Sequence, residues 1–301
     1  MSAVASDTSA APIVRKALAG DFEQVYRLLR GSPLNSRDLP RENRLRMFVK
    51  HWNSDEDYFG YVLEKDGDIV GYMGLMFSRR RIRDQEYKFC EVHSWYVKDE
   101  YRNESLRLFF PVVALKGYEI TNLTPTEGVA DIQKKFGFFD LETHLRIIYP
   151  VPSPATFRTR CRIEYEPARI EPLLRGRDQE IFRDHRHLNV LHVRVEDEQA
   201  RSCYLIAKPL HRRFYEPYGR VFYVGDLDAF LRFLPVLRVR LCWKLRVRCL
   251  VMNDAMLRGV KPRFSSVTAR DVPSIYKSKR LAKDDIDHLY STPLVLDYHM
   301  Q

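Results

Sequence analysis

The sequence predicts an α+β protein that is divided into two domains. Alternating apolar runs, typical of half-buried strands, are interspersed with amphipathic stretches of helical period along the chain. Its 301 residues exceed the usual size of one such unit. The segment VPSPATF, which follows Pro150, interrupts the pattern because proline continues neither a helix nor a central strand. We therefore expect domains at 12–150 and 151–301, preceded by a flexible tail at 1–11.

Strands and helices alternate in the first half. Ile13–Leu18 alternates as a strand, and Asp21 is placed to cap the amphipathic helix that follows. The stretch ENRLRMFVKHW predicts a second helix. Two alternating runs, 58–64 and 69–77, flank the turn sequence KDGD and therefore predict a β-hairpin. The remaining elements expected here are strands at 92–97, 118–123 and 141–149 and helices from Leu106 and at 126–135.

The second half shows a similar order of elements, though less clearly. Its predicted elements are a helix leading into a strand over 178–193, strands at 201–208, 221–224, 245–251 and 294–298, and helices at 230–237 and from Asp271. Two interpretations remain open, a degenerate copy of the first domain or an unrelated α+β domain. The loop after Val224 carries Asp226 and Asp228, whose carboxylates would repel a phosphate at a helix start.

Residues 88–110, KFCEVHSWYVKDEYRNESLRLFF, are the most informative stretch. An alternating strand runs into a short acidic turn, a small-residue loop and the start of an amphipathic helix. The first N–H groups of a helix have no partner within the helix, and the helix dipole favours negative charge there. The segment therefore predicts an anion site.

This segment resembles the pyrophosphate-binding motif of the GNAT acyltransferases, which bind acetyl-CoA at such a site. The family pattern is roughly Val-x-Pro-x-Tyr-Arg-Gly-x-Gly-x-Gly/Ala, and Val97, Tyr101 and Arg102 fit it. The chain departs from it at Asp99, Asn103, Ser105 and Arg107. The resemblance extends over the first half, where DIVGYMGLMF is similar to the family's second hairpin strand and KFGF to the ending of its last helix.

The resemblance implies a central mixed, twisted sheet flanked by helices, duplicated along the chain, and acyl transfer from acetyl-CoA or another acyl-CoA. The cofactor-binding positions it implies are Val97, Arg102, Asn103, Glu104, Ser105, Leu106, Arg107 and Asn122. Two roles for Arg107 stay open, because it could pair with a phosphate or fill the groove and abolish CoA binding.

Glu91 and His93 are the candidate catalytic residues. An amine must lose a proton before it attacks a thioester, so a base is needed beside the acyl group. The resemblance implies a carboxylate six residues before Val97, and that residue is Glu91. Strand alternation predicts that Glu91, His93, Trp95 and Val97 share one face, so His93 could serve instead. Each could also be an ordinary strand residue. The tyrosine that often serves as general acid in the family is replaced by Gln133.

The composition indicates which classes of ligand the protein is expected to bind. The net charge of +10 and the pI of about 9.3 favour anionic ligands such as CoA, and Arg79-Arg80-Arg81 with Arg83 forms a basic run. Nucleic acid is not expected, since the aromatic residues lack the spacing of a stacking platform. Five scattered cysteines suggest neither disulfides nor a metal site. No apolar run is long enough to span a membrane, so we expect a cytoplasmic protein. Nothing indicates the oligomeric state.

Two functions follow from these observations. The first is an N-acyltransferase that acts by direct transfer in a ternary complex with a small amine. The segment HSWYV-x-x-EYR resembles family members associated with bacterial surface-polysaccharide synthesis, and this resemblance implies an amino sugar as the acceptor. The alternative is a non-catalytic GNAT-like module that binds CoA or a protein partner, which Arg107, the missing glycines and Gln133 favour.

Overall fold

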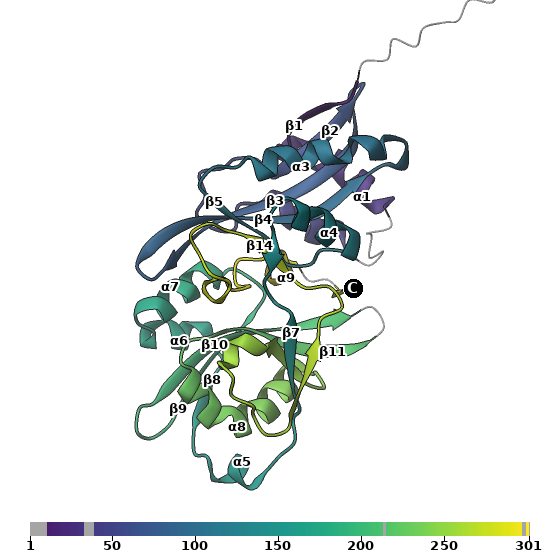
Figure 1. The fold of residues 1–301 in the computed structure, drawn as a ribbon. Coiled ribbons are helices and arrows are strands. Elements are labelled where there is room, and N and C mark those ends of the chain that lie inside the picture. The colour runs from purple at the N-terminus through teal and green to yellow at the C-terminus, as the bar shows by residue number, and fades with distance from the viewer. Residues whose placement is uncertain (1–10, 33–38, 213–214, 297–298, 301) are drawn as a thin grey trace, which may run out of the picture. The chain divides into compact units, whose positions relative to one another are not determined.

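The chain forms two compact units, residues 1–122 and 123–301, which Figure 1 shows as a ribbon. The computed structural model describes residues 11–32, 39–212, 215–296 and 299–300. All of the expected tail at 1–11 except Ala11 lies outside the described residues. No helix in these described ranges is both long and apolar enough to cross a membrane.

The first unit is built on a mixed sheet. Its strands follow the order β1-β2-β3-β4-β5, in which the first four are antiparallel neighbours and β5 is parallel to β4. The bounds are β1 Ile13–Lys16, β2 Gly60–Lys65, β3 Asp68–Ile82, β4 Gln85–Val97 and β5 Tyr118–Asn122. The predicted hairpin between β2 and β3 is confirmed, with Asp66 and Gly67 both at positive φ in its turn.

Helices cover both faces of this sheet. They are α1 Phe22–Arg30, α2 Arg41–Leu45 and α3 Ser105–Val113, with 3₁₀ turns η1 Ala19–Asp21, η2 Arg46–Phe48 and η3 Asp99–Glu104. Gly71 of β3 faces Leu108 of α3, whereas the next residue, Tyr72, stacks on Phe48 of η2. Consecutive strand residues point to opposite faces, so α3 lies on one face and η2 on the other.

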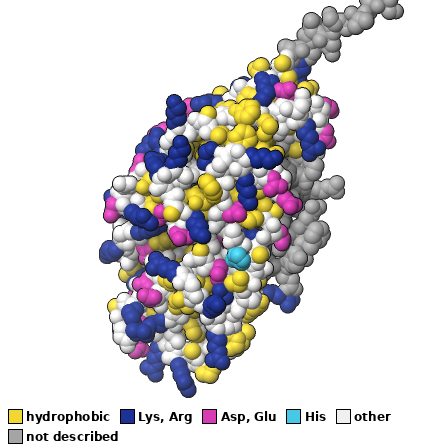
Figure 2. Space-filling model, viewed as in Figure 1, with side chains coloured by type: hydrophobic (Ala, Val, Ile, Leu, Met, Phe, Trp, Pro, Cys, Tyr) yellow, Lys and Arg dark blue, Asp and Glu magenta, His cyan; other side chains and the backbone are white. Residues whose placement is uncertain are grey.

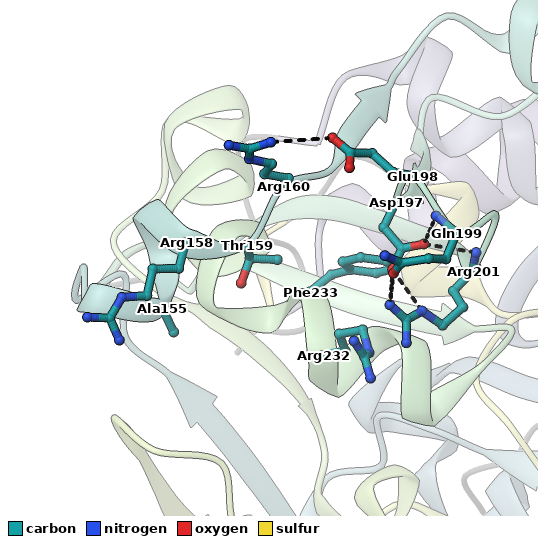
Figure 3. Close-up of a pocket in the computed structure, with 10 residues that line it drawn as sticks. All are labelled: Ala155, Arg158, Thr159, Arg160, Asp197, Glu198, Gln199, Arg201, Arg232 and Phe233. Carbon is teal, nitrogen blue, oxygen red and sulfur yellow. Dashed lines mark hydrogen bonds and ion pairs between the residues drawn. The ribbon is translucent and has the colours of Figure 1, made fainter.

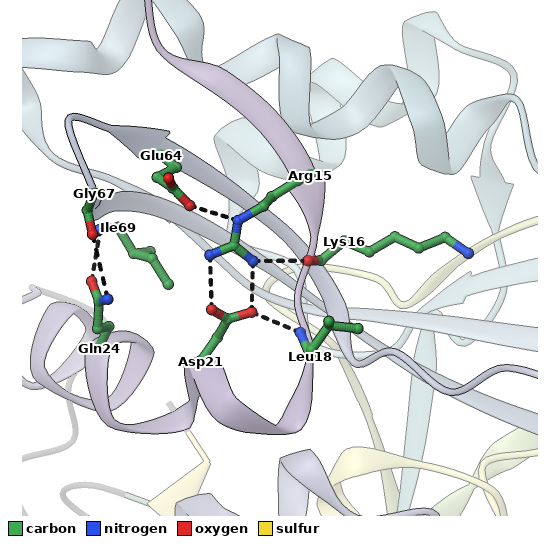
Figure 4. Close-up of polar contacts among 8 residues, drawn as sticks. All are labelled: Arg15, Lys16, Leu18, Asp21, Gln24, Glu64, Gly67 and Ile69. Carbon is green, nitrogen blue, oxygen red and sulfur yellow. Dashed lines mark hydrogen bonds and ion pairs between the residues drawn. The ribbon is translucent and has the colours of Figure 1, made fainter.

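Polar contacts fix the start of α1 (Figure 4). Asp21 precedes α1, as predicted, but its side chain does not cap the helix. Its carboxylate accepts hydrogen bonds from Arg15 and from the Leu18 N–H. Gln24 of α1 accepts from the Ile69 N–H, which ties this helix to the first residues of β3. The second predicted helix is shorter than expected, because α2 and η2 end where Val49 becomes extended.

The second unit contains a larger sheet of order β13-β7-β12-β11-β10-β9-β8, with β15 beside β10. The bounds are β7 His144–Ile148, β8 Arg162–Glu164, β9 Leu191–Glu196, β10 Ser202–Arg212, β11 Tyr215–Val224, β12 Leu250–Asn253, β13 Ser265–Ala269 and β15 His299–Met300. A short pair, β6 Phe139–Asp140 and β14 Ile275–Lys277, lies apart from it. The helices are α4 Glu127–Lys135, α5 Pro154–Arg158, α6 Pro167–Ile170, α7 Gly176–His185, α8 Leu227–Leu245 and α9 Thr292–Val295, with 3₁₀ turns η4 Glu171–Leu173, η5 Asp254–Leu257 and η6 Lys283–Asp285.

The core of this unit forms between α8 and its sheet. Phe230, Phe233, Leu237 and Leu241 of α8 are fully buried and pack with inward-facing residues of β9, β10 and β11. The predicted helix at 230–237 is therefore real but covers less than half of α8, which continues past Pro235 to Leu245. The strand expected from Leu245 begins only at Leu250, since α8 and its left-handed C-cap occupy the intervening residues.

Three predictions of individual strands and helices are wrong. The strand expected at 141–149 to close the first domain is β7, which instead pairs with β12 and β13. No helix starts at Asp271, because the chain runs from β13 to β14 there. The final strand expected at 294–298 overlaps α9, and its residues 297–298 lie outside the described residues.

Candidate functional site

A β-bulge interrupts β4 in the middle of the predicted site. His93 pairs with Gly74 and Tyr96 pairs with Tyr72, so two residues of β4 oppose the single residue between them on β3. One of the two is Ser94, whose φ is +50°. Such an extra residue leaves part of the ladder unpaired and changes which face the following side chains take.

The bulge separates residues that were expected to share a face. His93 lies against Gly74 and Tyr72, on the face that η2 covers. Trp95 instead stacks on Phe109 of α3, with 5.2 Å between ring centroids. Val97 also turns to the α3 face, where its side chain lies against Gly71. The prediction that Glu91, His93, Trp95 and Val97 share one face is therefore wrong for Trp95 and Val97, because simple alternation ignores the extra residue.

Glu91 and His93 do share a face, since the register between them is regular. Both are buried, with exposed fractions of 1% and 6%. His93 Nδ1 lies 3.2 Å from the Ser94 hydroxyl, and its Nε2 has no hydrogen-bond partner in the part of the chain that the structure describes. Burial lowers the pKa of His93 to about 4, so the imidazole is neutral near pH 7. A neutral imidazole can accept a proton, but only weakly at this pKa.

The strands β4 and β5 separate at the level of Glu91. Their parallel ladder joins Lys88–Glu91 to Tyr118–Thr121 and goes no further. Beyond it, β4 continues through the bulge to Val97, whereas β5 ends at Asn122, which is buried. The edge of β4 after Glu91 is therefore not paired with β5, and its backbone groups can bind an extended ligand.

The segment expected to be an open loop is helical. Residues 99–104 form η3, which leads directly into α3 at Ser105. The Tyr101 N–H donates to the Lys98 carbonyl and the Ser105 N–H to that of Arg102. The prediction of unpaired N–H groups is therefore wrong for Tyr101 and Ser105, because 3₁₀ hydrogen bonds already use them.

The side chains around the start of α3 pair mostly with one another. Arg107 donates to Glu104 at 2.6 Å, and Asn103 donates to the same carboxylate. Arg102 lies 3.6 Å from Asp99, and its side chain is 81% exposed. Leu106 is also exposed. Arg102 thus remains accessible to an anion, whereas Arg107 is held by Glu104.

Residues 22–106 match the model of the acetyltransferase (GNAT) family. They form a GNAT-family domain. The resemblance in the sequence is thereby confirmed for this segment, which contains β2, β3, β4 and η3.

Solved structures share the fold over most of the chain. A GCN5-related N-acetyltransferase from Kribbella flavida is 13% identical, with a TM-score of 0.58 over 90% of this chain and 72% of its own. A putative acetyltransferase from Pyrococcus horikoshii is 14% identical, with a TM-score of 0.55 over 93% and 94%. A GCN5-related glucosamine N-acetyltransferase region of a fungal multi-domain GH3 β-N-acetylglucosaminidase gives 13% identity and a TM-score of 0.60 over 92% and 39%. No curated protein matches the chain.

The first unit also contains a polar pair, Tyr118 and Glu56, that joins distant parts of its sequence. The Tyr118 hydroxyl donates a hydrogen bond to the Glu56 carboxylate at 2.8 Å. Burial raises the pKa of Tyr118, so the hydroxyl keeps its proton. Glu56 also lines a hollow of about 20 Å³ over Leu75–Phe77, which has room for one water. No local pattern marks Glu56, because its partner is 62 residues away.

Half of the basic run, Arg79 and Arg80, is held within the fold, whereas Arg81 and Arg83 are exposed. Arg79 pairs with Asp55 and Glu86, while Arg80 is buried over the Phe89 ring. On the face that Figure 2 shows, Lys and Arg side chains are interspersed with Asp and Glu. Among the described residues, no group of three or more His, Cys, Asp or Glu side chains is placed to hold a metal ion.

Proposed function

We propose that this protein is an acyl-CoA-dependent N-acyltransferase that uses acetyl-CoA and acts on a small amine in the cytoplasm. The observation that carries the proposal is the separation of β4 from β5 at Glu91, next to the bulge at Ser94. It gives the GNAT domain an unpaired strand edge beside two buried groups that can accept a proton. The second unit would be a degenerate GNAT-like domain.

The residues of this chain suit the amide-containing arm of CoA better than its pyrophosphate. The free edge of β4 up to Val97, with Asn122 at the end of β5, suits the extended amide-containing arm. Arg102 and the start of α3 would hold the pyrophosphate, together with the small Ser105. The Arg107–Glu104 pair leaves a carboxylate at this helix start, which opposes phosphate binding.

Glu91 is the base that the geometry favours. Acetyl-CoA supplies an activated acyl carbon when it is bound. As the N–C bond forms and the C–S bond breaks, CoA leaves as the thiolate, and Glu91 takes the proton that the amine loses, directly or through a water. The buried position of Glu91 strengthens its interaction with a cationic amine before that transfer. His93, neutral near pH 7, orients the amine or serves as a second acceptor.

An amino sugar is the acceptor we favour. The resemblance of the segment HSWYV-x-x-EYR to family members of surface-polysaccharide synthesis supports this acceptor. The fold shared with the fungal region described as a glucosamine N-acetyltransferase supports it as well. We take surface-polysaccharide synthesis as the setting that such an acceptor implies.

A second function is favoured by the start of α3. Glu104 and Arg107 neutralise each other there, and η3 uses N–H groups that a phosphate would need. If these contacts persist, the domain would be a non-catalytic GNAT-like module for CoA or a protein partner.

Calorimetry with acetyl-CoA distinguishes the two functions. We expect micromolar binding by the wild type and its loss in Ser105→Asp, which adds a negative charge at the helix start. Glu91→Gln should keep acetyl-CoA binding but lower the rate of glucosamine acetylation about 10²–10⁴-fold. Glu86→Gln, an exposed residue on the same strand, is the matched control. Full activity in Glu91→Gln would exclude its role as base, and binding without turnover on any amine would support the second function.

A further inference from the structure

The second unit carries a segment whose apolar side chains are turned toward solvent, at residues 151–158, VPSPATFR. This segment contains α5, and none of its residues is buried. Its exposed apolar residues are Val151, Pro152, Pro154, Ala155 and Phe157. The Phe157 side chain is 82% exposed, more than any other large apolar side chain among the described residues. Single apolar residues are normal at a protein surface, whereas a contiguous group of them often marks an interaction site.

The polar side chains of this segment face the protein instead. The Thr156 hydroxyl donates to the Pro235 carbonyl of α8 at 2.9 Å, and the Ser153 hydroxyl accepts from the Arg238 guanidinium of the same helix at 3.1 Å. Arg238 is buried and also donates to the Arg263 carbonyl. Polar contacts thus fix α5 on α8 and leave its apolar residues outside. This is the reverse of an ordinary surface helix, whose apolar residues face the core.

Positive charge surrounds these apolar residues. Residues 150–163 contain no carboxylate but three arginines, Arg158, Arg160 and Arg162. After Asp228, α8 also contains no carboxylate, and its basic residues are Arg232, Arg238, Arg240 and Lys244. Figure 1 shows α5 at one end of the second unit, and at that end Figure 2 shows hydrophobic side chains among those of Lys and Arg.

The arginine of α5 itself is turned to solvent. Figure 3 shows the Arg158 side chain pointing away from the other residues drawn around α5. In the part of the chain that the structure describes, Arg158 forms no ion pair, and Arg160 lies 3.9 Å from Glu198 with both side chains largely exposed. The charge next to Phe157 is therefore available to an anionic surface.

We propose that residues 151–158, with the basic residues around them, dock the second unit onto an anionic lipid membrane. The Phe157 ring enters the interface between headgroups and acyl chains, where exposed aromatic and aliphatic groups are stabilised. The arginines need not converge on one ligand, because a charged surface attracts each cation within a Debye length of about 8–10 Å. A lipid surface also adapts to protruding residues, whereas a folded partner would need a matching groove. The inference concerns the second unit alone and does not rest on acyl transfer.

Cosedimentation of the full-length chain with vesicles tests the proposal. We expect binding to vesicles of equal parts phosphatidylserine and phosphatidylcholine, and much weaker binding to phosphatidylcholine alone. Phe157→Ser should raise the apparent Kd about tenfold, because it removes the inserted ring, whereas Phe157→Leu should keep most of the affinity. Arg158→Gln should raise the apparent Kd about fivefold, and added salt should do the same.

Matched controls lie elsewhere on the same unit. Phe139→Ser removes another exposed aromatic side chain, on β6, and Arg183→Gln removes an exposed arginine of α7. Figure 1 shows α7 and β14, the strand that pairs with β6, at the opposite end of the unit from α5. Neither control should change vesicle binding.

Three outcomes would overturn the proposal. One is the absence of cosedimentation with the phosphatidylserine vesicles. Another is an equal loss in Phe139→Ser and Phe157→Ser, which would mean that any exposed aromatic side chain adheres to lipid. The third is a loss in Arg158→Gln with none in Phe157→Ser, which would mean that the basic surface attracts polyanions such as nucleic acid without insertion of α5.

Discussion

Glu142 shows how a single buried charge is accommodated in the second unit. Its carboxylate is fully buried and pairs with Arg220 at 2.5 Å and with Arg270. Burial alone would raise the pKa of Glu142, but Arg220, His288 and Arg270 outweigh it and lower the pKa to about 2. The carboxylate therefore stays charged and balances two cationic side chains, of which Arg220 is buried and Arg270 partly buried.

Removing this carboxylate should be costly. We expect Glu142→Gln to lower the free energy of unfolding by about 3–5 kcal/mol, because it leaves Arg220 and Arg270 without their counterion. The stabilisation by Glu142 is fully present above its unfolded pKa of about 4.5 and is lost as pH falls toward 2. Urea unfolding of the variant and of Glu171→Gln, a surface ion-pair control, measures the difference. Equal stability of the two would mean that the buried pairing contributes nothing net.

Position 74 requires glycine because the His93 ring leaves no room for a side chain, not because of its backbone angles. A Cβ at this position would lie 2.1 Å from His93 Cε1, so the imidazole must move if any side chain is added. We expect Gly74→Ala to cost about 1–3 kcal/mol of stability and to change the environment of His93. The measurement is urea unfolding together with the NMR titration of His93. Gly20→Ala, where a Cβ meets nothing within 4 Å, should be near neutral. An unchanged His93 signal in Gly74→Ala would contradict this packing.

At the scale of elements, a β-hairpin could be predicted from the sequence only where its turn has a typical turn sequence. The β2–β3 hairpin was predictable because its turn carries Gly67 in a standard hairpin sequence. The next turn uses Arg83 and Asp84, both at positive φ, and although Asp favours turns, Arg does not. The predicted strand at 69–77 is therefore too short, because β3 continues through Arg79, Arg80 and Arg81 to Ile82.

The same contrast holds for the candidate site. The sequence correctly places Glu91 and His93 on one strand, since a regular strand fixes which residues share a face. It could not place Trp95, because the bulge depends on pairing with β3, a strand that is remote in sequence. Likewise, whether residues 99–104 form a loop or a 3₁₀ turn depends on hydrogen bonds that composition does not show.

The bulge itself can be tested through Ser94. A β-branched side chain is disfavoured at a φ of +50°, whereas glycine is tolerated there. We expect Ser94→Val to be less stable than Ser94→Gly by about 1–3 kcal/mol in urea unfolding. If the two variants are equally stable, the left-handed backbone at this residue is not required. Both variants lack the Ser94 hydroxyl that contacts His93, so the loss of this contact does not affect the comparison.

At the scale of the whole molecule, both units bury neutral histidines. Burial lowers the pKa of His93 in the first unit, and of His192 and His288 in the second, to about 4. Each residue is less than a tenth exposed. His192 is held by the Tyr204 hydroxyl at 2.7 Å, and His288 has the Glu142, Arg220 and Arg270 charges nearby. Buried neutral imidazoles therefore occur in the cores of both units and not only at the candidate functional site.

These histidines should make the protein sensitive to mild acid. Their unfolded pKa is about 6.5, so between about pH 6.5 and 4 the unfolded chain binds protons that the folded chain does not. Stability is therefore fully present above pH 6.5 and falls as pH decreases, by several kcal/mol in sum. Urea unfolding at about pH 7, 5.5 and 4.5 measures the loss, and His192→Phe should reduce it because one titrating group is removed. Constant stability across this range would show that the imidazoles become protonated without unfolding. The loss precedes that from Glu142, which begins only below about pH 4.5, so acid should destabilise the protein in two separable steps.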